Sequence, residues 1–150
     1  MVCRWLPDGQ NFISDSGNGI TVRNLRGTII HQWNSDYLLD LAFTPDGSKM
    51  VCADEKGKLL VYSIKDGFRE LNHCQMSYAM TSISVSKDSK YVLLSSMAPE
   101  VLLIDIEELK CLRSFKGHAQ QRDMMIRSCF GGPEENFVLS GSEGIQNYKK

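Results

Sequence analysis

The sequence predicts an all-β fold of three four-stranded antiparallel blades plus part of a fourth, a β-propeller that is not closed. A turn followed by an apolar strand recurs four times, with spacings of 38, 41 and 46 residues between Phe12, Met50, Tyr91 and Phe137. A period near 40 residues filled with short strands is typical of a propeller blade. Propellers contain roughly four to eight blades, so 150 residues hold three blades and a fraction. The recurring turns are Pro7-Asp8-Gly9, Pro45-Asp46-Gly47, Lys87-Asp88-Ser89 and Pro133-Glu134-Glu135.

The second repeat shows the four strands of one blade. Its apolar segments alternate and are rich in β-branched residues, which indicates strands and not helices. Proline and glycine in the turn at 45–47 supply the backbone angles that a tight turn needs. The expected strands are 38–44, 50–53, 59–64 and 68–72.

The third and first repeats follow the same order. Segment 107–110 resembles a piece of helix, but so short a helix is marginal between two strands, and a turn is expected. The first strands are the most apolar and the last the most charged, as in a blade with its outer strand in solvent. The expected strands are 81–86, 91–95, 101–106 and 111–115 in the third repeat, and 2–6, 12–14, 20–23 and 28–33 in the first. The predicted blades are about 1–35, 36–77 and 78–118, with an incomplete blade at 119–150.

Composition argues against nucleic acid and membrane partners. Hydrophobic residues make up 42% of the chain and charged residues 23%, and the net charge is −1. Nucleic-acid binding needs a basic surplus that is missing here. No apolar run approaches the roughly 18 residues of a membrane span, and the start does not resemble a signal peptide. We therefore expect a protein of the cytoplasm, the nucleus or both.

The five cysteines are Cys3, Cys52, Cys74, Cys111 and Cys129. Most of them stand among apolar residues of predicted strands, where a free thiol packs as a small hydrophobic group. We expect them to be reduced and buried.

No constellation for catalysis, metal binding or cofactor binding stands out. His31 falls on an outer strand, and His73 and His118 on connecting loops, without metal-ligand spacing. Ser84 and Lys87 match a Ser-x-x-Lys pattern, but they lie on a strand that enters a turn, and chance is the favoured explanation. We expect no enzyme, no cofactor and no small-molecule substrate.

Dipeptides at the end of each third strand resemble the signature of WD-repeat proteins. Ile104-Asp105 stands where that family carries Trp-Asp, and Gly117-His118 stands where it carries Gly-His. Arg23-Asn24 and Tyr62-Ser63 occupy the corresponding places in the earlier repeats. The recurrence with correctly placed turns resembles a WD-repeat propeller, although no single repeat has the full signature.

Segments 116–118, 126–132 and 137–143 are similar to a particular subfamily, the WD-repeat subunit of the GID/CTLH ubiquitin ligase in a plant-like form. The string Ile126-Arg127-Ser128-Cys129-Phe130-Gly131-Gly132 carries this resemblance. It implies a scaffold or substrate-recruiting subunit in proteasome-dependent degradation, with other ligase subunits and substrates as partners. The family also carries LisH and CTLH helical segments and more blades, so the chain resembles a fragment. After Glu143 it departs from the family, which leaves incomplete the hydrogen-bonded set that would include His118 and Ser140.

The loop from Gly117 to Met125 contains the contact candidates Arg122, Asp123 and Met124. Loops of this kind open on a propeller face that often binds partners, although a solvated loop is the simpler interpretation. Met125 is expected in the core. Two alternatives to the ligase scaffold remain: a general WD-repeat adaptor in signalling or chromatin complexes, and a truncated product without independent function.

Overall fold

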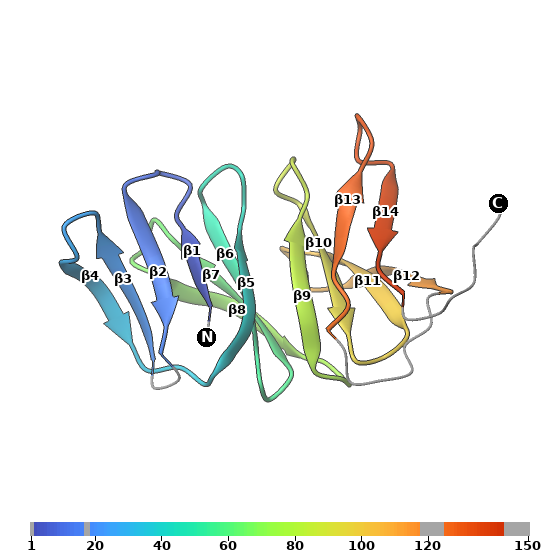
Figure 1. The fold of residues 1–150 in the computed structure, drawn as a ribbon, viewed down its shortest axis with the longest axis horizontal. Helices are drawn as coiled ribbons and strands as arrows, with labels where there is room; N and C mark the ends of the chain where they lie inside the picture. The colour runs from blue at the N-terminus through green and yellow to red at the C-terminus, as the bar shows by residue number, and fades with distance from the viewer. Residues whose placement is uncertain (1, 17–18, 118–124, 143–150) are drawn as a thin grey trace.

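The fold is that of a computed structural model, which describes residues 2–16, 19–117 and 125–142 (Figure 1). Every regular element in these ranges is a β-strand. The strands of the first half are β1 (Cys3–Trp5), β2 (Asn11–Asp15), β3 (Ile20–Asn24), β4 (Ile29–Trp33), β5 (Leu38–Phe43), β6 (Lys49–Asp54), β7 (Lys58–Ser63) and β8 (Arg69–Gln75). They are followed by β9 (Met80–Val85), β10 (Tyr91–Ser96), β11 (Glu100–Asp105), β12 (Cys111–Lys116), β13 (Ser128–Gly131) and β14 (Phe137–Ser140).

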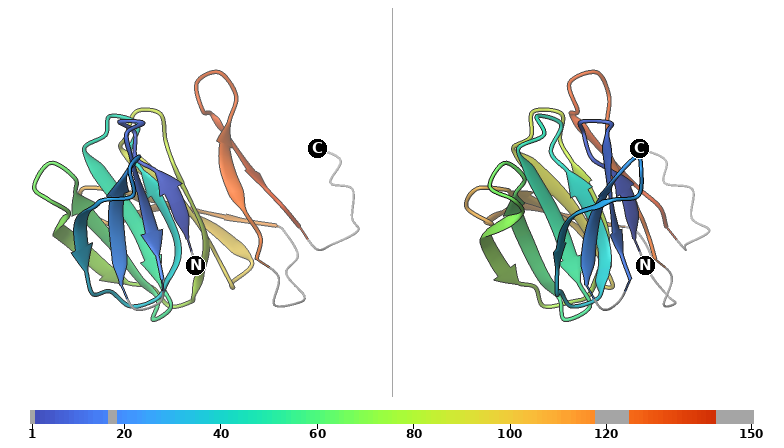
Figure 2. Two further views of the ribbon diagram at one scale, coloured as in Figure 1. Left: turned by 60° about the vertical axis from the view of Figure 1, so that its left-hand side comes forward. Right: turned by 90° about the vertical axis from the view of Figure 1, so that its left-hand side faces the viewer.

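Four antiparallel sheets follow one another in chain order along the long axis of the molecule (Figures 1 and 2). The first three sheets are β1–β4, β5–β8 and β9–β12, each with its strands in sequence order. The fourth is the two-stranded hairpin of β13 and β14. The sheets do not close into a ring, so the prediction of three blades and part of a fourth is confirmed.

The strand registers confirm the repeat and correct one of the positions predicted to be equivalent. Phe12 and Met50 each lie opposite the last residue of the preceding strand. In the third sheet that place belongs to Val92, which lies opposite Val85, so Val92 and not Tyr91 is the structural equivalent. Segment 107–110 is a turn, as predicted, and Leu109 has a φ of 52° there.

The second sheet is buried on both faces because strand side chains alternate between two hydrophobic clusters. Met50 and Cys52 of β6 face the first sheet, and Val51 and Ala53 face the third. The cluster between the first two sheets contains Val2, Leu6, Ile13, Ile20, Val22, Leu38, Leu41, Met50, Cys52, Tyr62 and Phe68. The cluster between the second and third contains Val51, Ala53, Leu59, Val61, Met80, Ile83, Val92, Leu94, Ile104 and Ile106.

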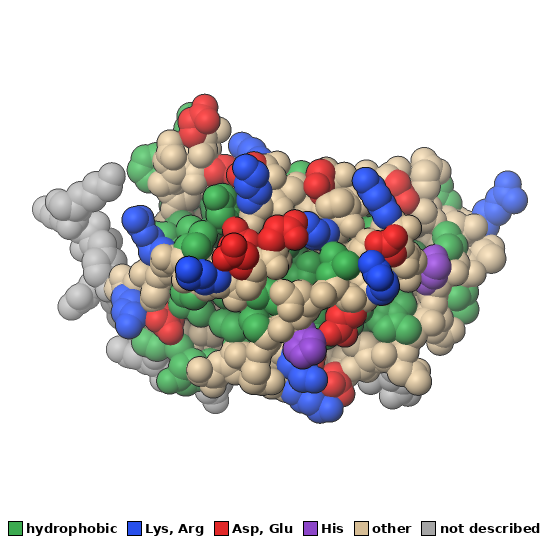
Figure 3. All heavy atoms as spheres, turned by 180° about the vertical axis from the view of Figure 1, so that it is seen from behind, with side chains coloured by type: hydrophobic (Ala, Val, Ile, Leu, Met, Phe, Trp, Pro, Cys, Tyr) green, Lys and Arg blue, Asp and Glu red, His purple; other side chains and the backbone are tan. Residues whose placement is uncertain are grey.

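The outer strands β4, β8 and β12 are largely exposed. Side chains of β8 interact locally: His73 Nδ1 lies 2.7 Å from Glu70 Oε1, and Arg69 pairs at 3.6 Å with Asp66 of the preceding turn. Acidic and basic side chains are interspersed over the face opposite that of Figure 1 (Figure 3). The gradient from apolar inner strands to polar outer strands is therefore confirmed. His73 lies within a strand and not in the predicted loop.

Two burial predictions were wrong. All five cysteines are free, as expected, but Cys3, Cys111 and Cys129 are exposed, and only Cys52 is fully buried. Met125 is 67% exposed, although it was expected in the core. Each exposed residue stands on an outer strand or at an end of the array, where no neighbouring sheet in the described part of the chain covers it. Across the described residues, the structure has no helix with the length and apolarity needed to cross a membrane.

Candidate interaction surface

Asp40, on β5, is a buried carboxylate that joins three consecutive sheets. Its Oδ1 accepts a hydrogen bond from Arg4 Nη2 of β1 at 3.2 Å. Its Oδ2 accepts one from the backbone N–H of Ile83, on β9, at 2.9 Å. Hydrogen bonds to an ionised group are strong when buried, so Asp40 fixes how the first three sheets are placed.

Hydroxyl groups make the corresponding link between the third sheet and the hairpin. Ser95 and Ser128 share a hydroxyl–hydroxyl bond of 2.8 Å, and the Ser128 backbone N–H donates to Ser82 Oγ at 3.4 Å. Thr81 Oγ1 donates to the carbonyl of Ile126 at 3.0 Å. This interface therefore uses neutral and weaker hydrogen bonds than those of Asp40.

The turns between the first and second strands of the sheets lie together at one edge of the array, at the top of Figure 1, and we call this the turn edge. Hydrogen bonds join the second of these turns to the third and the third to the fourth. The backbone N–H of Asp46 donates to Ser89 Oγ at 3.1 Å, and that of Lys87 donates to Glu135 Oε2 at 2.7 Å. The turn edge is thus a continuous surface made by equivalent parts of successive repeats.

A hydroxyl–carboxylate bond closes the turns of the second and third sheets. Thr44 Oγ1 donates to Asp46, and Ser86 Oγ donates to Asp88, both at 2.6 Å. The Thr44 hydroxyl lowers the pKa of Asp46 to about 2, with help from the Ser48 backbone N–H. The Ser86 hydroxyl likewise lowers the pKa of Asp88. Both carboxylates therefore stay ionised at neutral pH and give the turn edge a negative character.

The predicted signature dipeptides occupy the last two places of their strands. Tyr62 and Ile104 are buried in the two clusters, and Arg23 is half-buried on the face of the first sheet that points away from the second. The second residue of each dipeptide caps the turn that follows. Ser63 Oγ donates to Asp66 Oδ2 at 2.7 Å, and Asp105 Oδ1 accepts the backbone N–H of Glu107 at 2.8 Å.

Three other predicted positions have mixed outcomes. Gly117 and Ser140 line one cleft of about 340 Å³ between the third sheet and the hairpin. His118, whose hydrogen-bonded set with Ser140 was expected to be incomplete, lies outside the described residues. The contact candidates Arg122, Asp123 and Met124 also lie outside them and remain predictions.

Ser84 lies on β9 and Lys87 in the turn that follows it, as the sequence predicted. The nearby Ser86 hydroxyl is committed to Asp88 and accepts the Tyr91 backbone N–H at 3.0 Å, a turn-closing role. Within the described ranges, no three His, Cys, Asp or Glu side chains are placed to hold a metal ion.

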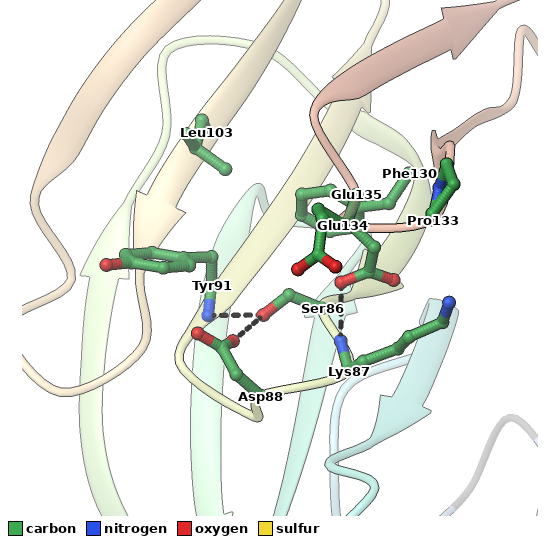
Figure 4. A pocket seen from close by; sticks show the side chains of 9 residues that line it. All are labelled: Ser86, Lys87, Asp88, Tyr91, Leu103, Phe130, Pro133, Glu134 and Glu135. Atoms are coloured by element: carbon green, nitrogen blue, oxygen red, sulfur yellow. Dashed lines mark hydrogen bonds between the residues drawn. The ribbon is translucent and has the colours of Figure 1, made fainter.

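Another cleft between the third sheet and the hairpin lies at the turn edge, and the sequence did not predict it. It has a volume of about 430 Å³, and we call it the Tyr91 cleft (Figure 4). One feature of the sequence could have pointed to this cleft: Glu134-Glu135 places an extra carboxylate where two other turns carry Asp-Gly. The cleft is lined by Ser86, Lys87, Asp88, Tyr91, Leu103, Phe130, Pro133, Glu134 and Glu135.

These sheets, with their inner strands side by side and their outer strands in solvent, define the propeller-blade class. Comparison with known proteins agrees. The model of the WD domain, G-beta repeat, matches residues 109–145. The chain is 38% identical to GID complex subunit 7 of Schizosaccharomyces pombe over 94% of its length. It is 31% identical to the WD repeat-containing protein WDS homolog of Arabidopsis thaliana over 97% of its length, and 32% identical to that organism's WD repeat-containing protein 26 homolog, also over 97%.

The chain belongs to the WD-repeat family. It spans between 25% and 29% of the length of these three relatives. The resemblance that the dipeptides and segment 126–132 indicated is confirmed.

Proposed function

We propose that this chain is a non-enzymatic interaction scaffold within a ubiquitin ligase complex of the GID type. The observation that carries the proposal is its 38% identity, over 94% of the chain, to a protein named GID complex subunit 7. Proteins of the same complex and substrates marked for degradation are the proposed partners. Ubiquitin transfer itself would then fall to other subunits.

The architecture supports a scaffold. Equivalent turns of successive sheets form one continuous edge, and a partner that contacts several repeats gains specificity from each of them. The net charge of −1 supports a protein partner more than a nucleic acid. Five free cysteines fit a reducing compartment, so we propose that the protein acts in the cytoplasm, the nucleus or both.

A chimera in fission yeast tests the proposal. The stretch of GID complex subunit 7 that aligns with this chain would be replaced by residues 1–150, in cells without the natural subunit. We expect the chimera to co-purify with the other GID complex subunits and to restore ubiquitination by the purified complex. Quantitative mass spectrometry and an in vitro ubiquitination assay would measure both.

A chimera carrying Leu59→Arg provides the control, because a charge at this fully buried site should unfold the second sheet and abolish both readouts. A well-folded chimera that fails to assemble would contradict the ligase proposal. That result would favour the general WD-repeat adaptor. The names of the two Arabidopsis relatives fit this alternative, because they state only that these proteins contain WD repeats.

A further inference from the structure

A polar hollow lies between the first and second sheets, and we call it the Asp54 cleft. It opens where the connection from β4 to β5 passes the turn between β6 and β7, at the edge of the array opposite the turn edge (Figure 1). All strands of these two sheets are described, so the hollow does not come from an absent neighbour. Its volume of about 410 Å³ lies within the range of ligand-binding clefts. Its lining includes Ser35, Asp36, Asp54, Lys58, Tyr62 and Glu70.

The equivalent place between the second and third sheets is nearly filled. Trp33 and Cys74 lie opposite equivalent residues of their third strands, so Ser35 and Met76, two residues further on, correspond to each other. Met76 packs on the second cluster, and the space left there is about 90 Å³. The short side chain of Ser35 therefore leaves open a space that a long side chain fills in the next interface.

Asp54 is a buried carboxylate whose partners are incomplete. It ends β6, is 2% exposed, and accepts the Lys58 backbone N–H at Oδ1 over 2.8 Å. The described residues donate no hydrogen bond to its Oδ2 and give it no counter-ion. Asp40, by contrast, pairs with Arg4, and the uncharged Ser96 ends β10 where Asp54 ends β6. Because a buried charge without a partner is costly, a cation that enters the cleft would stabilise Asp54.

The other charges of the cleft leave it negative. Asp36 is already paired with a lysine at 2.7 Å. Glu70 lies opposite Tyr62 across the strand pair, and burial together with this carboxylate raises the pKa of the Tyr62 hydroxyl, which stays neutral. Lys58 is the one basic side chain in the described lining, and it makes no ion pair within the described part of the chain. Asp54 and Glu70 together therefore outweigh Lys58.

We propose that the Asp54 cleft binds an arginine side chain of a partner protein. The guanidinium donates to Asp54 Oδ2 and to the Glu70 carboxylate, and its stem occupies the space that Met76 fills in the next interface. A guanidinium suits this place because its planar N–H donors can serve two carboxylates and because it is weakly hydrated for a cation. This inference rests on the proposed scaffold function, because it names the chemistry of a partner.

Nuclear magnetic resonance titration of the 150-residue chain tests the inference. The probe is N-acetyl-arginine amide, and its neutral counterpart is N-acetyl-citrulline amide. We expect the arginine probe to give saturable shifts in the Lys58 backbone amide and the Tyr62 ring, with an affinity at least about fivefold above that of the citrulline probe. Ser35→Met copies Met76 into the hollow and should lower the affinity about tenfold by occupying the space, without lowering the urea midpoint.

Charge variants test the two carboxylates and the competing ammonium group. Asp54→Asn still accepts the Lys58 N–H and should weaken the arginine probe about tenfold. Glu70→Gln should weaken it about threefold, because one partly exposed charge pair is lost. Lys58→Met should strengthen it by a similar factor, because it removes a repelling charge. The matched controls are Glu108→Gln and Lys110→Met, at exposed positions outside the lining, which should leave the affinity unchanged.

Three results would each overturn the inference: equal binding of both probes, equal effects of the cleft variants and their controls, or full affinity in Ser35→Met. Glu70 is exposed, so Glu70→Gln keeps the test decisive even if Asp54→Asn does not fold.

The same variants in the yeast chimera separate this inference from the proposed function. If Ser35→Met assembles normally and the unmodified chain ignores the arginine probe, the cleft proposal fails and the scaffold proposal stands. If the probe binds as expected but the chimera does not assemble, the ligase proposal fails and the cleft remains a site for arginine side chains.

Discussion

The second sheet and the β13–β14 hairpin are built from similar alternating strands but differ sharply in burial. Residues 50–53 of β6 are all fully buried, two on each face. On β14, Phe137 is 57% exposed and Leu139 is 60% exposed. The first sheet has a similar open face, where Trp5 packs edge-on against Phe12 at 5.7 Å and stays 60% exposed.

This difference shows that a blade strand has apolar residues on both faces. Those residues are buried only where a neighbouring sheet packs on each face. Repeat units of this kind owe much of their stability to the interfaces between them. A sheet between two others should therefore tolerate changes least, and the hairpin should tolerate them most.

The largest expected contrast is in thiol reactivity. Cys129 of β13 is exposed, whereas Cys52 of β6 is buried and its pKa is raised by burial. We expect a disulfide reagent at pH 8 to modify Cys52 about a thousandfold or more slowly, because its exposure requires an opening of nearly the full folding free energy. Mass spectrometry of the time course would measure both rates. Similar rates would mean that the second sheet opens locally.

Side-chain truncation should give the largest contrast in folding free energy. Leu59→Ala removes a fully buried side chain of the second cluster and should destabilise the chain by about 3 kcal/mol. Leu139→Ala on the hairpin should change the stability by less than about 0.5 kcal/mol. Urea denaturation followed by circular dichroism would measure both. Equal losses would indicate that another surface covers Leu139 in solution.

The polar links between sheets should differ less. Asp40→Ala leaves the Ile83 backbone N–H and the Arg4 guanidinium without their carboxylate and should cost about 2 kcal/mol. Ser128→Ala removes one neutral hydroxyl bond to Ser95 and should cost about 1 kcal/mol. Denaturation midpoints of the two variants would rank them. A larger loss for Ser128→Ala would show that the hairpin interface is the stronger one.

The smallest effect is a pH dependence at the turn edge. Folding lowers the pKa of Asp46 from 3.8 to about 2, so the folded state favours the carboxylate. Its stabilising contribution is complete above pH 3.8 and disappears as the pH falls to about 2, and solvent screening keeps it small because Asp46 is exposed. Thermal melts of the chain and of Asp46→Asn between pH 2 and 5 would measure it. Identical curves would contradict this role of Asp46.

Local sequence patterns predicted the strands because the pattern of a short segment depends on the backbone conformation of that same segment. Alternation of apolar residues located β5–β12 to within about two residues at most ends, except that β8 runs on to Gln75. Turn residues placed the hairpins, and the end of each third strand falls at its dipeptide. The one shift in register, from Tyr91 to Val92, arose because an aromatic residue, Tyr91, stands where the other repeats carry the polar Asn11 and Lys49.

Burial at the ends of the array and the Tyr91 cleft could not be predicted in the same way. Cys129 and Met125 stand in segments that look like an inner strand and its approach, yet both are exposed. Their burial depends on a neighbouring sheet, which no local pattern reports. The cleft brings together Tyr91, Phe130 and Glu134, which lie on separate strands and a separate turn.

The sequence by itself determined the order of strands, the turn positions and the repeat, because hydrogen bonding and turn geometry act over a few residues. Only the tertiary structure decided which apolar faces are covered, how Asp40 joins three sheets, and which charged side chains meet at the Tyr91 cleft. Those features depend on distances between residues about 35 to 50 positions apart. The physical reason is that the contacts between two sheets depend on the side chains of both sheets. The formation of a strand depends mainly on the alternation of residues within that strand.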